Sequence, residues 1–398
     1  MYNIANHYEN IYHYLKTIIT DPRVVYLHPF GATQPENIEI IRTDPGDADL
    51  SPIIFLKRGP LFIFYDQEPL NFNYNKKVFD YIVANYQGPY VLVSTEQHSQ
   101  EKDQICKHYN FASIDYFFHI FAAADWFRGN TYMSTLTPPR SRTIEKTYIT
   151  FNRLTSNDRI YRSLLINELY TNNLLDHGYV SYSQECPDGG NFADNLIAGI
   201  KNYQLDTNLV KSAISNINQL PELRIDFAQE DYIPNQSMLL SPINELMKSF
   251  IFLVTETCFW QNKTHLTEKI FKPIVLRMPF ILVGCVSNLE YLRQYGFKTF
   301  SDYWDESYDS ITDPIKRLQT IVKVLTTINQ LSKLEQKDML LDMLPILNHN
   351  YKLFNNNKFV KNEWQHLTSE LSNISQLYKF EKPYRFDPVL KQAIPVTV

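Results

Sequence analysis

Short apolar runs alternate along this chain with segments of helical period, and this alternation constrains the fold more than any other feature. Residues 61–65, 91–94, 147–151 and 250–255 have the length of buried strands, and each run leads into polar residues. Segments in which apolar residues recur every three to four positions follow several of them. Strands that alternate with helices favour a parallel sheet covered on both faces. The sequence therefore predicts an α/β fold.

The stretch 266–284, LTEKIFKPIVLRMPFILVG, combines a polar helix start, a short amphipathic helix and a buried strand that ends on glycine. Its first turn carries Thr267, Glu268, Lys269 and Lys272. Free N–H groups and a partial positive charge at a helix start suit a diphosphate. A carboxylate there can accept hydrogen bonds from the ribose hydroxyls. The residues thus describe a nucleotide-sugar site. From this pattern alone, a plain capped helix with a solvated first turn is a slightly better explanation.

The length of 398 residues predicts two domains of about 150 residues each, or slightly more. The Pro-rich, charged segment 137–146 is interpreted as the linker. We expect an N-terminal domain over 1–140, a C-terminal domain over 146–357 and a final helical segment over 358–398. Residues 184–243 are polar and amide-rich, which indicates an insertion or an acceptor-facing segment. Helices are predicted near 8–20, 99–109, 158–175, 206–218, 287–295, 314–332, 334–349 and 358–379, and further strands at 24–27, 115–121, 180–183 and 280–283.

Composition excludes several classes of protein. Hydrophobic residues make up 44% and charged residues 20%, an ordinary globular balance. No apolar run has the length of a membrane helix, and the N-terminus lacks a signal-peptide core, so a cytoplasmic protein is expected. The net charge of −5 disfavours broad non-specific binding of nucleic acid. The four cysteines are scattered and form no metal-binding or disulfide pattern.

Polar residues that follow the predicted strands are the candidate site, because ligands bind at the carboxyl ends of parallel strands. The N-terminal half is rich in acids there and the C-terminal half holds the cations. This division suits an acceptor-activating half and a diphosphate-binding half, although strand exits are polar in any α/β protein. The N-terminal set is His28, Asp66, Gln67, Glu68, Glu96, His98, Asp125 and Arg128. The C-terminal set is Asn152, Arg153, Arg159, Glu256, Glu268, Lys269 and Lys272.

Individual residues in these sets allow more than one interpretation. Arg153 and Arg159 near a helix start are unfavourable with the helix dipole unless an anion binds there, but they are also plausible surface arginines. Glu68, at a strand end before a proline, suits a general base with a raised pKa and equally suits a helix cap. The acidic pair Asp47 and Asp49 resembles a metal-binding DxD signature but lies in a Pro/Gly loop, so no metal site is predicted.

Three stretches resemble motifs of α1,3-fucosyltransferase-like enzymes and occur in that family's order. Residues 266–284 are similar to the donor-site motif, in which T-E-K precedes a short helix and an apolar strand ending P-V-V-x-G. Residues 64–81, FYDQEPLNFNYNKKVFDY, resemble the N-terminal motif of an aromatic strand, a glutamate, a proline and a later F-D. Residues 149–162, ITFNRLTSNDRIYR, are similar to the strand followed by Asn and Arg. Exostosin-like transferases share much of the C-terminal pattern.

The resemblance implies a GT-B architecture, with two Rossmann-like domains facing across a cleft and a C-terminal helix crossing back to the N-terminal domain. It implies an inverting glycosyltransferase that needs no metal or other cofactor and uses a nucleotide-diphosphate sugar. Glu268 would contact the donor ribose, Lys269 the diphosphate, and Arg153 or Arg159 a phosphate. Glu68 would be the catalytic base. Thr267, Lys272 and Glu256 complete the expected donor site, and the expected acceptor side comprises Asp66, Gln67, Glu96, His98, Asp125 and Arg128.

The chain departs from the family pattern at three points. Pro273 interrupts the helix after T-E-K, which predicts a late start or a kink. The serine usual between the glutamate and the proline is missing at Glu68-Pro69, and residues 184–243 have no counterpart. A glycan is the expected acceptor. A hydroxylated DNA base is the alternative, because viral enzymes of this architecture modify DNA, in which case the location would be the host cytoplasm. A non-catalytic binding protein with the same fold, and more weakly a phosphate-ester hydrolase, stay open.

Overall fold

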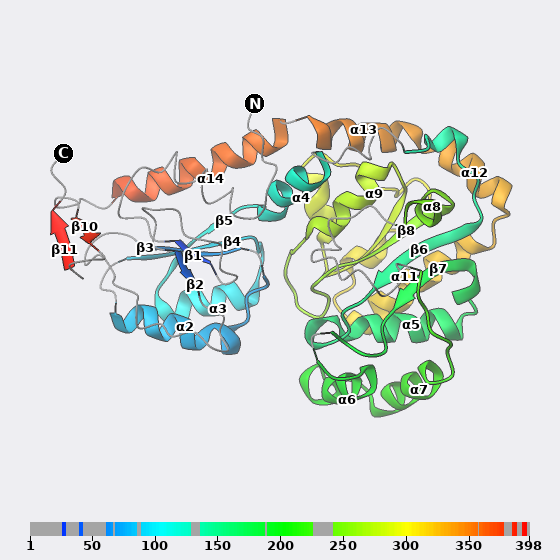
Figure 1. Ribbon diagram of the computed structural model, residues 1–398, viewed down its shortest axis with the longest axis horizontal. Coiled ribbons are helices and arrows are strands. Elements are labelled where there is room, and N and C mark those ends of the chain that lie inside the picture. Colours follow the sequence, from blue (N-terminus) through cyan, green and yellow to red (C-terminus); the bar gives the residue numbers. More distant parts are fainter. Residues whose placement is uncertain are drawn as a thin grey trace. The chain divides into compact units, whose positions relative to one another are not determined.

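The computed structural model describes residues 26–28, 40–42, 61–66, 68–85, 89–128, 136–187, 189–225, 242–356, 358–377, 384–387 and 392–395. The chain divides into two compact units. The first comprises Met1–Asp125 together with Asn357–Val398, and the second comprises Trp126–Asn356. Each unit contains a parallel β-sheet with helices packed beside it (Figure 1). The predicted α/β fold with two Rossmann-like units is therefore confirmed.

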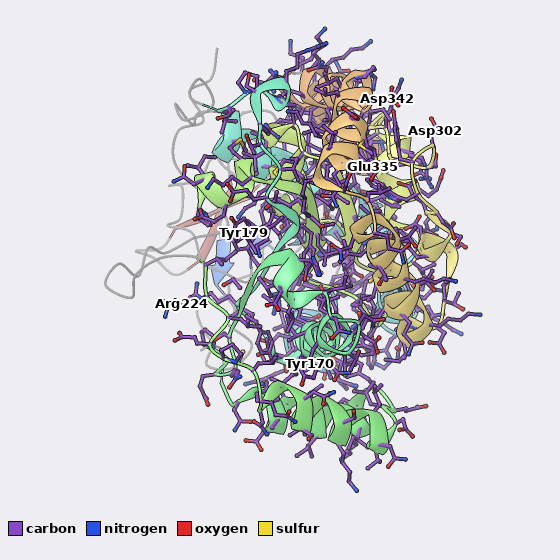
Figure 2. All side chains as sticks on the ribbon, turned by 90° about the vertical axis from the view of Figure 1, so that its right-hand side faces the viewer. Tyr170, Tyr179, Arg224, Asp302, Glu335 and Asp342 are labelled. Atoms are coloured by element: carbon purple, nitrogen blue, oxygen red, sulfur yellow. The ribbon has the colours of Figure 1, made fainter. Side chains whose placement is uncertain are left out.

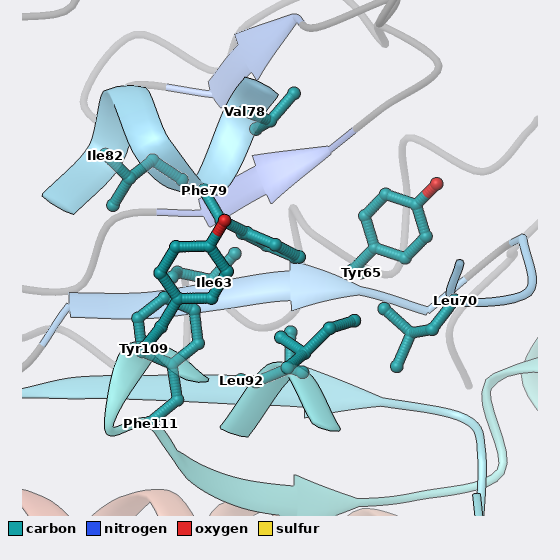
Figure 3. Packing of buried hydrophobic residues seen from close by; sticks show 10 residues of the cluster. Ile63, Tyr65, Leu70, Val78, Phe79, Ile82, Leu92, Tyr109 and Phe111 are labelled. Atoms are coloured by element: carbon teal, nitrogen blue, oxygen red, sulfur yellow. The ribbon is translucent and has the colours of Figure 1, made fainter. Parts of the chain in front are cut away.

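The first unit is built on the parallel sheet β3-β4-β5 (Leu61–Tyr65, Tyr90–Ser94 and Ala112–Asp115). Strands β1 (Tyr26–His28) and β2 (Ile40–Arg42) pair in parallel, and β10 (Tyr384–Asp387) and β11 (Gln392–Pro395) pair antiparallel. Helices α2 (Phe72–Asn85) and α3 (Gln100–Tyr109) follow β3 and β4 in the chain. Figure 3 shows the core between these helices and the sheet, where Phe79, Tyr109 and Phe111 pack ring against ring beside Ile63 and Leu92.

The last long helix, α14 (Lys358–Leu377), belongs to this first unit although it lies far along the chain from the sheet. The carboxylate of Glu363 accepts a hydrogen bond from the backbone N–H of Phe117 at 2.6 Å. The rings of Trp364 and Phe121 meet edge to face, 5.7 Å between centroids. The predicted return of the C-terminal helix to the N-terminal sheet is thus explained by a buried polar contact and an aromatic contact.

The second unit is built on four parallel strands in the order β7-β6-β8-β9. These are β6 (Lys146–Asn152), β7 (Gly178–Tyr182), β8 (Ser249–Thr255) and β9 (Phe280–Val283). All seven residues of β8 are buried, as expected for a central strand covered on both faces. The helical elements, in chain order, are η2 (Pro139–Ser141), η3 (Asn157–Ile160), α5 (Tyr161–Thr171), η4 (Leu175–His177), α6 (Phe192–Asn202), α7 (Thr207–Ile217), α8 (Ile243–Met247), η6 (Glu268–Ile270), α9 (Phe271–Leu276), α10 (Asn288–Gln294), η7 (Ser307–Ser310), α11 (Pro314–Asn329), α12 (Lys333–Asp342) and α13 (Leu344–Asn355).

The order of these strands creates a switch point between β6 and β8. From β6 the chain crosses to β7 on one side, and from β8 it crosses to β9 on the other. Because such crossovers are right-handed, α5 and α9 cover opposite faces of the sheet, as Figure 1 shows. Loops that leave β6 and β8 therefore diverge at their carboxyl ends, which is where open α/β sheets bind ligands. This edge begins with Asn152 and Glu256.

The predicted strands 61–65 and 280–283 agree with β3 and β9 at every residue, and helix α7 matches the prediction near 206–218. Helices 99–109 and 358–379 are likewise confirmed by α3 and α14. The start of α12 is stabilised by side-chain capping. Ser332 and Glu335 exchange hydrogen bonds in a capping box, so the backbone N–H groups of both residues are satisfied. Glu335 is labelled on this helix in Figure 2.

Two expectations about the chain's course are corrected. Asp125 and Arg128 do not follow a strand, because α4 (Phe118–Arg128) runs through both positions. Its Ala-rich centre is a strong helix former. Buried aromatic residues flank this centre on both sides, so the sequence shows no clear helical period. Residues 137–146 lie within the second unit and do not form the expected linker, because the boundary between the two units falls after Asp125. The Arg142 guanidinium is buried there and donates to the carbonyls of Leu276 and Arg277. The predicted helix near 8–20 and the pair Asp47 and Asp49 lie outside the described residues.

Among the helices in the described part of the chain, none combines the length and the apolar character that crossing a bilayer requires.

Candidate functional site at the β8–β9 edge

Glu256 follows β8 and is fully buried at the switch point. Its Oε2 accepts hydrogen bonds from the Thr267 hydroxyl at 2.5 Å and from the Thr267 backbone N–H at 3.2 Å. Within the described residues, its Oε1 is buried and has no hydrogen-bond partner. Burial raises the pKa of Glu256, while the charge of Lys269 and the bonds from Thr267 oppose that rise. An acceptor atom in this state is unusual in a folded protein.

Lys269 lies beside this carboxylate at the start of the next helix. Its Nζ donates to the hydroxyls of Thr257 at 3.3 Å and Thr267 at 3.1 Å, and to Glu268 Oε1 at 3.1 Å. The lysine side chain is 28% exposed, whereas that of Glu268 is 9% exposed. The ammonium group therefore remains at the surface of the cluster, where it can reach an anion. Thr267 holds the arrangement together because its hydroxyl contacts both Glu256 and Lys269.

Lys269 lies in a 3-10 turn that directly precedes the α-helix containing Pro273. Thr267 is the N-cap, the 3-10 segment η6 begins at Glu268, and α9 continues from Phe271. Pro273 therefore falls in the first turn of the α-helix, where its missing N–H has no intrahelical acceptor to lose. The predicted late start is found, because the α-helix begins at Phe271 and a 3-10 turn over Glu268–Ile270 precedes it. Glu268 and Lys269 consequently lie on a helical turn rather than in a loop.

The backbone at the β8 exit is held by two residues that sequence reasoning missed. The Tyr161 hydroxyl donates to the carbonyl of Glu256 at 2.5 Å, and Arg162 donates to the carbonyls of Thr255 and Glu256, both at 3.1 Å. Both residues stand at the end of the stretch that resembles the family's Asn-Arg motif. Arg162 is thus an arginine of this stretch that reaches the β8 exit. Arg153, directly after β6, and Arg159, in η3, are each partly buried.

The β6 exit contributes neutral polar atoms to the same edge. Asn152 is fully buried, and its amide nitrogen donates to the Thr150 hydroxyl at 3.2 Å. Its Oδ1 and the buried hydroxyl of Ser156 have no hydrogen-bond partner among the described residues. Asn152 was a candidate from its position after a strand, but Ser156 carried no signal. Together with Glu256 Oε1, these atoms make the β6–β8 switch point a region of unsatisfied acceptors.

Gly284 allows β9 to end close to this region. A Cβ atom at that position would lie 2.8 Å from Asn288 Nδ2 and 3.5 Å from the side chain of Glu256. Asn288 in turn holds the backbone of His265 through two hydrogen bonds of 3.0 and 3.1 Å. The glycine is therefore required by close approach to Asn288. Lys272, the second residue of α9, is partly buried on the same helix.

The candidates of the first unit have more varied surroundings. Glu68 is partly buried just after β3, close enough for its charge to add to the rise in the pKa of Tyr65, which is mainly due to burial. Asp66 is fully buried and accepts a hydrogen bond from the Tyr116 hydroxyl. His98 is exposed and has a positive φ of 49°. Gln67 and the side chains of Asp125 and Arg128 lie outside the described residues.

Glu96 is the candidate with the clearest structural role. It is 1% exposed, its Oε1 accepts from the backbone N–H of Leu70 at 2.8 Å, and its Oε2 accepts from the Ser99 hydroxyl. Ser99 is also the N-cap of α3. The carboxylate thus joins the loop after β3 to the start of α3, and both of its oxygens are engaged within the protein.

The raised pKa of Glu256 predicts how stability depends on pH. The folded protein keeps a proton on Glu256 at pH values where the unfolded chain, with an ordinary pKa near 4.5, has lost it. Stability should therefore fall as pH rises from that value towards the raised pKa. Glu256→Gln removes this titration. The stability of the variant relative to that of the wild type should therefore increase between pH 4 and pH 8. Urea unfolding at both pH values measures the difference. A difference that does not change with pH would contradict the prediction.

In the described part of the chain, no group of three or more His, Cys, Asp or Glu side chains is placed to hold a metal ion.

Comparison with known proteins identifies distant structural likeness only. No protein-family model and no curated protein matches the sequence. Among solved structures, the DNA-modifying enzyme β-glucosyltransferase, determined with and without its substrate uridine diphosphoglucose, is 8% identical with a TM-score of 0.41. That match covers 80% of this chain and 74% of the enzyme. A glycosyltransferase from Rickettsia africae ESF-5 is 12% identical with a TM-score of 0.31, over 77% of this chain and 70% of that one. Similarity this low carries no argument about activity.

Proposed function

We propose that this protein is a glycosyltransferase that binds a nucleoside-diphosphate sugar at the β8–β9 edge of its second unit. One observation carries the proposal: Glu256, Thr267, Glu268 and Lys269 converge at the carboxyl end of β8, at the switch point of a parallel sheet. Glu268 keeps the ribose contact that the family resemblance implies, and the buried Oε1 of Glu256, which has no partner among the described residues, suits a second ribose hydroxyl that donates a hydrogen bond. The partly exposed ammonium of Lys269 suits a diphosphate oxygen.

The remaining residues take roles that agree with their chemistry. Arg153, Arg159 and Lys272 are further cations of this unit and are proposed to contact the diphosphate. Thr267 positions the site, because it orients both Glu256 and Lys269. Tyr161 and Arg162 fix the β8 exit on which the carboxylate stands.

In the proposed reaction, Glu68 takes the proton from an acceptor hydroxyl. The hydroxyl oxygen then forms a bond to the anomeric carbon of the donor. The bond from that carbon to the diphosphate oxygen breaks, and the electron pair leaves with the nucleoside diphosphate. Lys269 and the arginines stabilise the charge that develops on the leaving group. This inverting scheme, with Glu68 as the base, follows the resemblance of residues 64–81 and is the finer part of the proposal.

Replacement of Lys269 by alanine tests the donor site. Loss of a hydrogen bond to a charged group costs about 1.5–3 kcal/mol, so affinity for the nucleoside diphosphate should fall about 10- to 150-fold. Isothermal titration with UDP and GDP measures the effect. Lys316→Ala is the matched control, because Lys316 is an exposed lysine of the same unit on α11. Equal affinity in wild type and Lys269→Ala would remove this residue from the donor site.

Transfer assays decide the acceptor and separate an enzyme from a binding protein. Labelled UDP- and GDP-sugars, including the fucose donor, are offered with oligosaccharides and with DNA that carries hydroxymethylated bases. A glycan is the proposed acceptor, because the net charge of −5 disfavours DNA. Transfer to DNA alone would replace that acceptor assignment. Nucleotide binding without transfer or release of free sugar would favour a non-catalytic role.

A further inference from the structure

An aromatic pair lies beside the proposed donor site. Trp260, in the loop after β8, and Tyr203, which follows α6, stack with ring centroids 4.7 Å apart and planes inclined by 26°. Both side chains are partly exposed. Neither belongs to the expected site residues, and the function proposed above assigns them no role.

Both rings are fixed in place by one residue. Trp260 Nε1 donates to the backbone carbonyl of Asp158 at 3.0 Å, and the Tyr203 hydroxyl donates to Asp158 Oδ1 at 2.5 Å. Asp158 lies in η3, next to Arg159 and just beyond the β6 exit. The polar groups of the pair are therefore used within the protein. The Trp260 ring stacks on Tyr203 and meets Phe259 edge to face at 5.5 Å, and its remaining, partly exposed part is ring surface. A ring that is already immobilised loses little conformational entropy when a ligand stacks on it.

The loop that carries Trp260 is held along its length. Tyr161 and Arg162 bind the carbonyl of Glu256. Phe259 stacks on Tyr161 with centroids 4.3 Å apart, and its carbonyl accepts a hydrogen bond from Arg317. Trp260 is four residues from Glu256, so their Cα atoms lie within about 14 Å, a span that a nucleoside diphosphate covers.

The residue after Trp260 adds a second observation. The amide Oε1 of Gln261 is buried and has no hydrogen-bond partner among the described residues. A buried acceptor without a donor lowers stability, and a ligand N–H in reach would remove that cost. Nucleobases present such N–H groups at their edges together with an aromatic face, so one ligand matches both Trp260 and Gln261.

We propose that Trp260, supported by Tyr203, is the stacking platform for the base of the donor nucleotide, and that Gln261 binds the edge of that base. This inference rests on the proposed function, because it places the base next to the ribose and diphosphate contacts of Glu256 and Lys269. The platform is specific to the nucleoside part of the donor. A ligand that has phosphates but no base gains nothing from it.

Binding of UDP and GDP compared with inorganic pyrophosphate tests the platform. Trp260→Leu should lower the affinity for UDP and GDP about 5- to 150-fold, which is the range for loss of one base–aromatic stack. The affinity for pyrophosphate should not change. Lys269→Ala should lower the affinity for all three ligands. Titrations are run below the unfolding temperature of each variant. In a second readout, UDP or GDP should quench tryptophan emission in the wild type and not in Trp260→Phe, which keeps the other three tryptophans.

Each result decides the proposal. Selective loss of UDP and GDP affinity in Trp260→Leu, with quenching lost in Trp260→Phe, supports the platform. Unchanged UDP and GDP affinity overturns it and leaves the proposed function standing. Equal weakening of pyrophosphate also overturns it, because Trp260 would then act on the shape of the loop. If the wild type binds none of the three ligands, the proposed function fails and the platform fails with it.

Discussion

Replacement of Glu68 by glutamine is expected to lower the rate of sugar transfer about 100- to 10,000-fold, the range that a positioned general base contributes. Glutamine keeps the size and the hydrogen-bonding capacity of the side chain but cannot take a proton from the acceptor. Nucleotide affinity should not change, because the residues proposed to bind the donor belong to the second unit. Single-turnover transfer with labelled donor measures the rate, and titration with the free nucleoside diphosphate measures affinity.

A matched control for this experiment lies in the same unit. The Glu101 carboxylate accepts a hydrogen bond from the backbone N–H of Phe72 at 2.8 Å, so it caps the start of α2. Glu101→Gln keeps the acceptor oxygen and should transfer at nearly the wild-type rate. Transfer by Glu68→Gln at the wild-type rate would exclude Glu68 as the base. A loss of nucleotide affinity in that variant would instead indicate a structural role.

The fold could be predicted from the sequence because period and strand length are local signals. Residues 280–283 are four apolar residues between Pro279 and Gly284, and β9 has the same bounds. The polar start at Thr267 likewise predicted a helical turn that presents Glu268 and Lys269. The signal failed at α4 (Phe118–Arg128). In α4, apolar residues fill every face, so no helical stripe separates inside from outside.

The partners of the site could not be predicted, because they depend on contacts between distant residues. Nothing local distinguishes Arg162 from Arg153 or Arg159, yet Arg162 binds the carbonyl of Glu256, ninety-four positions away. Glu96 illustrates the opposite case. Its place after a strand is typical of a ligand contact, while the N–H of Leu70 and the hydroxyl of Ser99 occupy its oxygens. Position after a strand thus locates the edge where ligands bind, and tertiary contacts decide which residues remain available.

Replacement of Arg317 by leucine is expected to destabilise the second unit by about 3–5 kcal/mol, because several carbonyls lose hydrogen bonds from a charged donor, each of which contributes about 1.5–3 kcal/mol. Arg317 is 1% exposed, and its guanidinium donates to the carbonyls of Gly284 at 3.1 Å, Ile311 at 2.6 Å and Phe259. Leucine fills part of the volume but leaves these carbonyls without a donor. Urea unfolding followed by tryptophan emission measures the loss. Arg140→Leu, at an exposed arginine of the same unit, should change stability by no more than about 0.5 kcal/mol.

The same substitution should also weaken nucleotide binding, because Arg317 joins the two loops that border the proposed site. Gly284 ends β9 beside Glu256, and Phe259 precedes Trp260. Without the guanidinium, these loops lose their common anchor, and the ligand must order them when it binds. Arg317→Lys keeps a buried charge with fewer donors. Its stability and its nucleotide affinity should lie between those of Arg317→Leu and the wild type. A variant that loses stability but keeps full affinity for UDP and GDP would show that Tyr161 and Arg162 hold the β8 exit without Arg317. An unchanged unfolding midpoint would contradict the structural role itself.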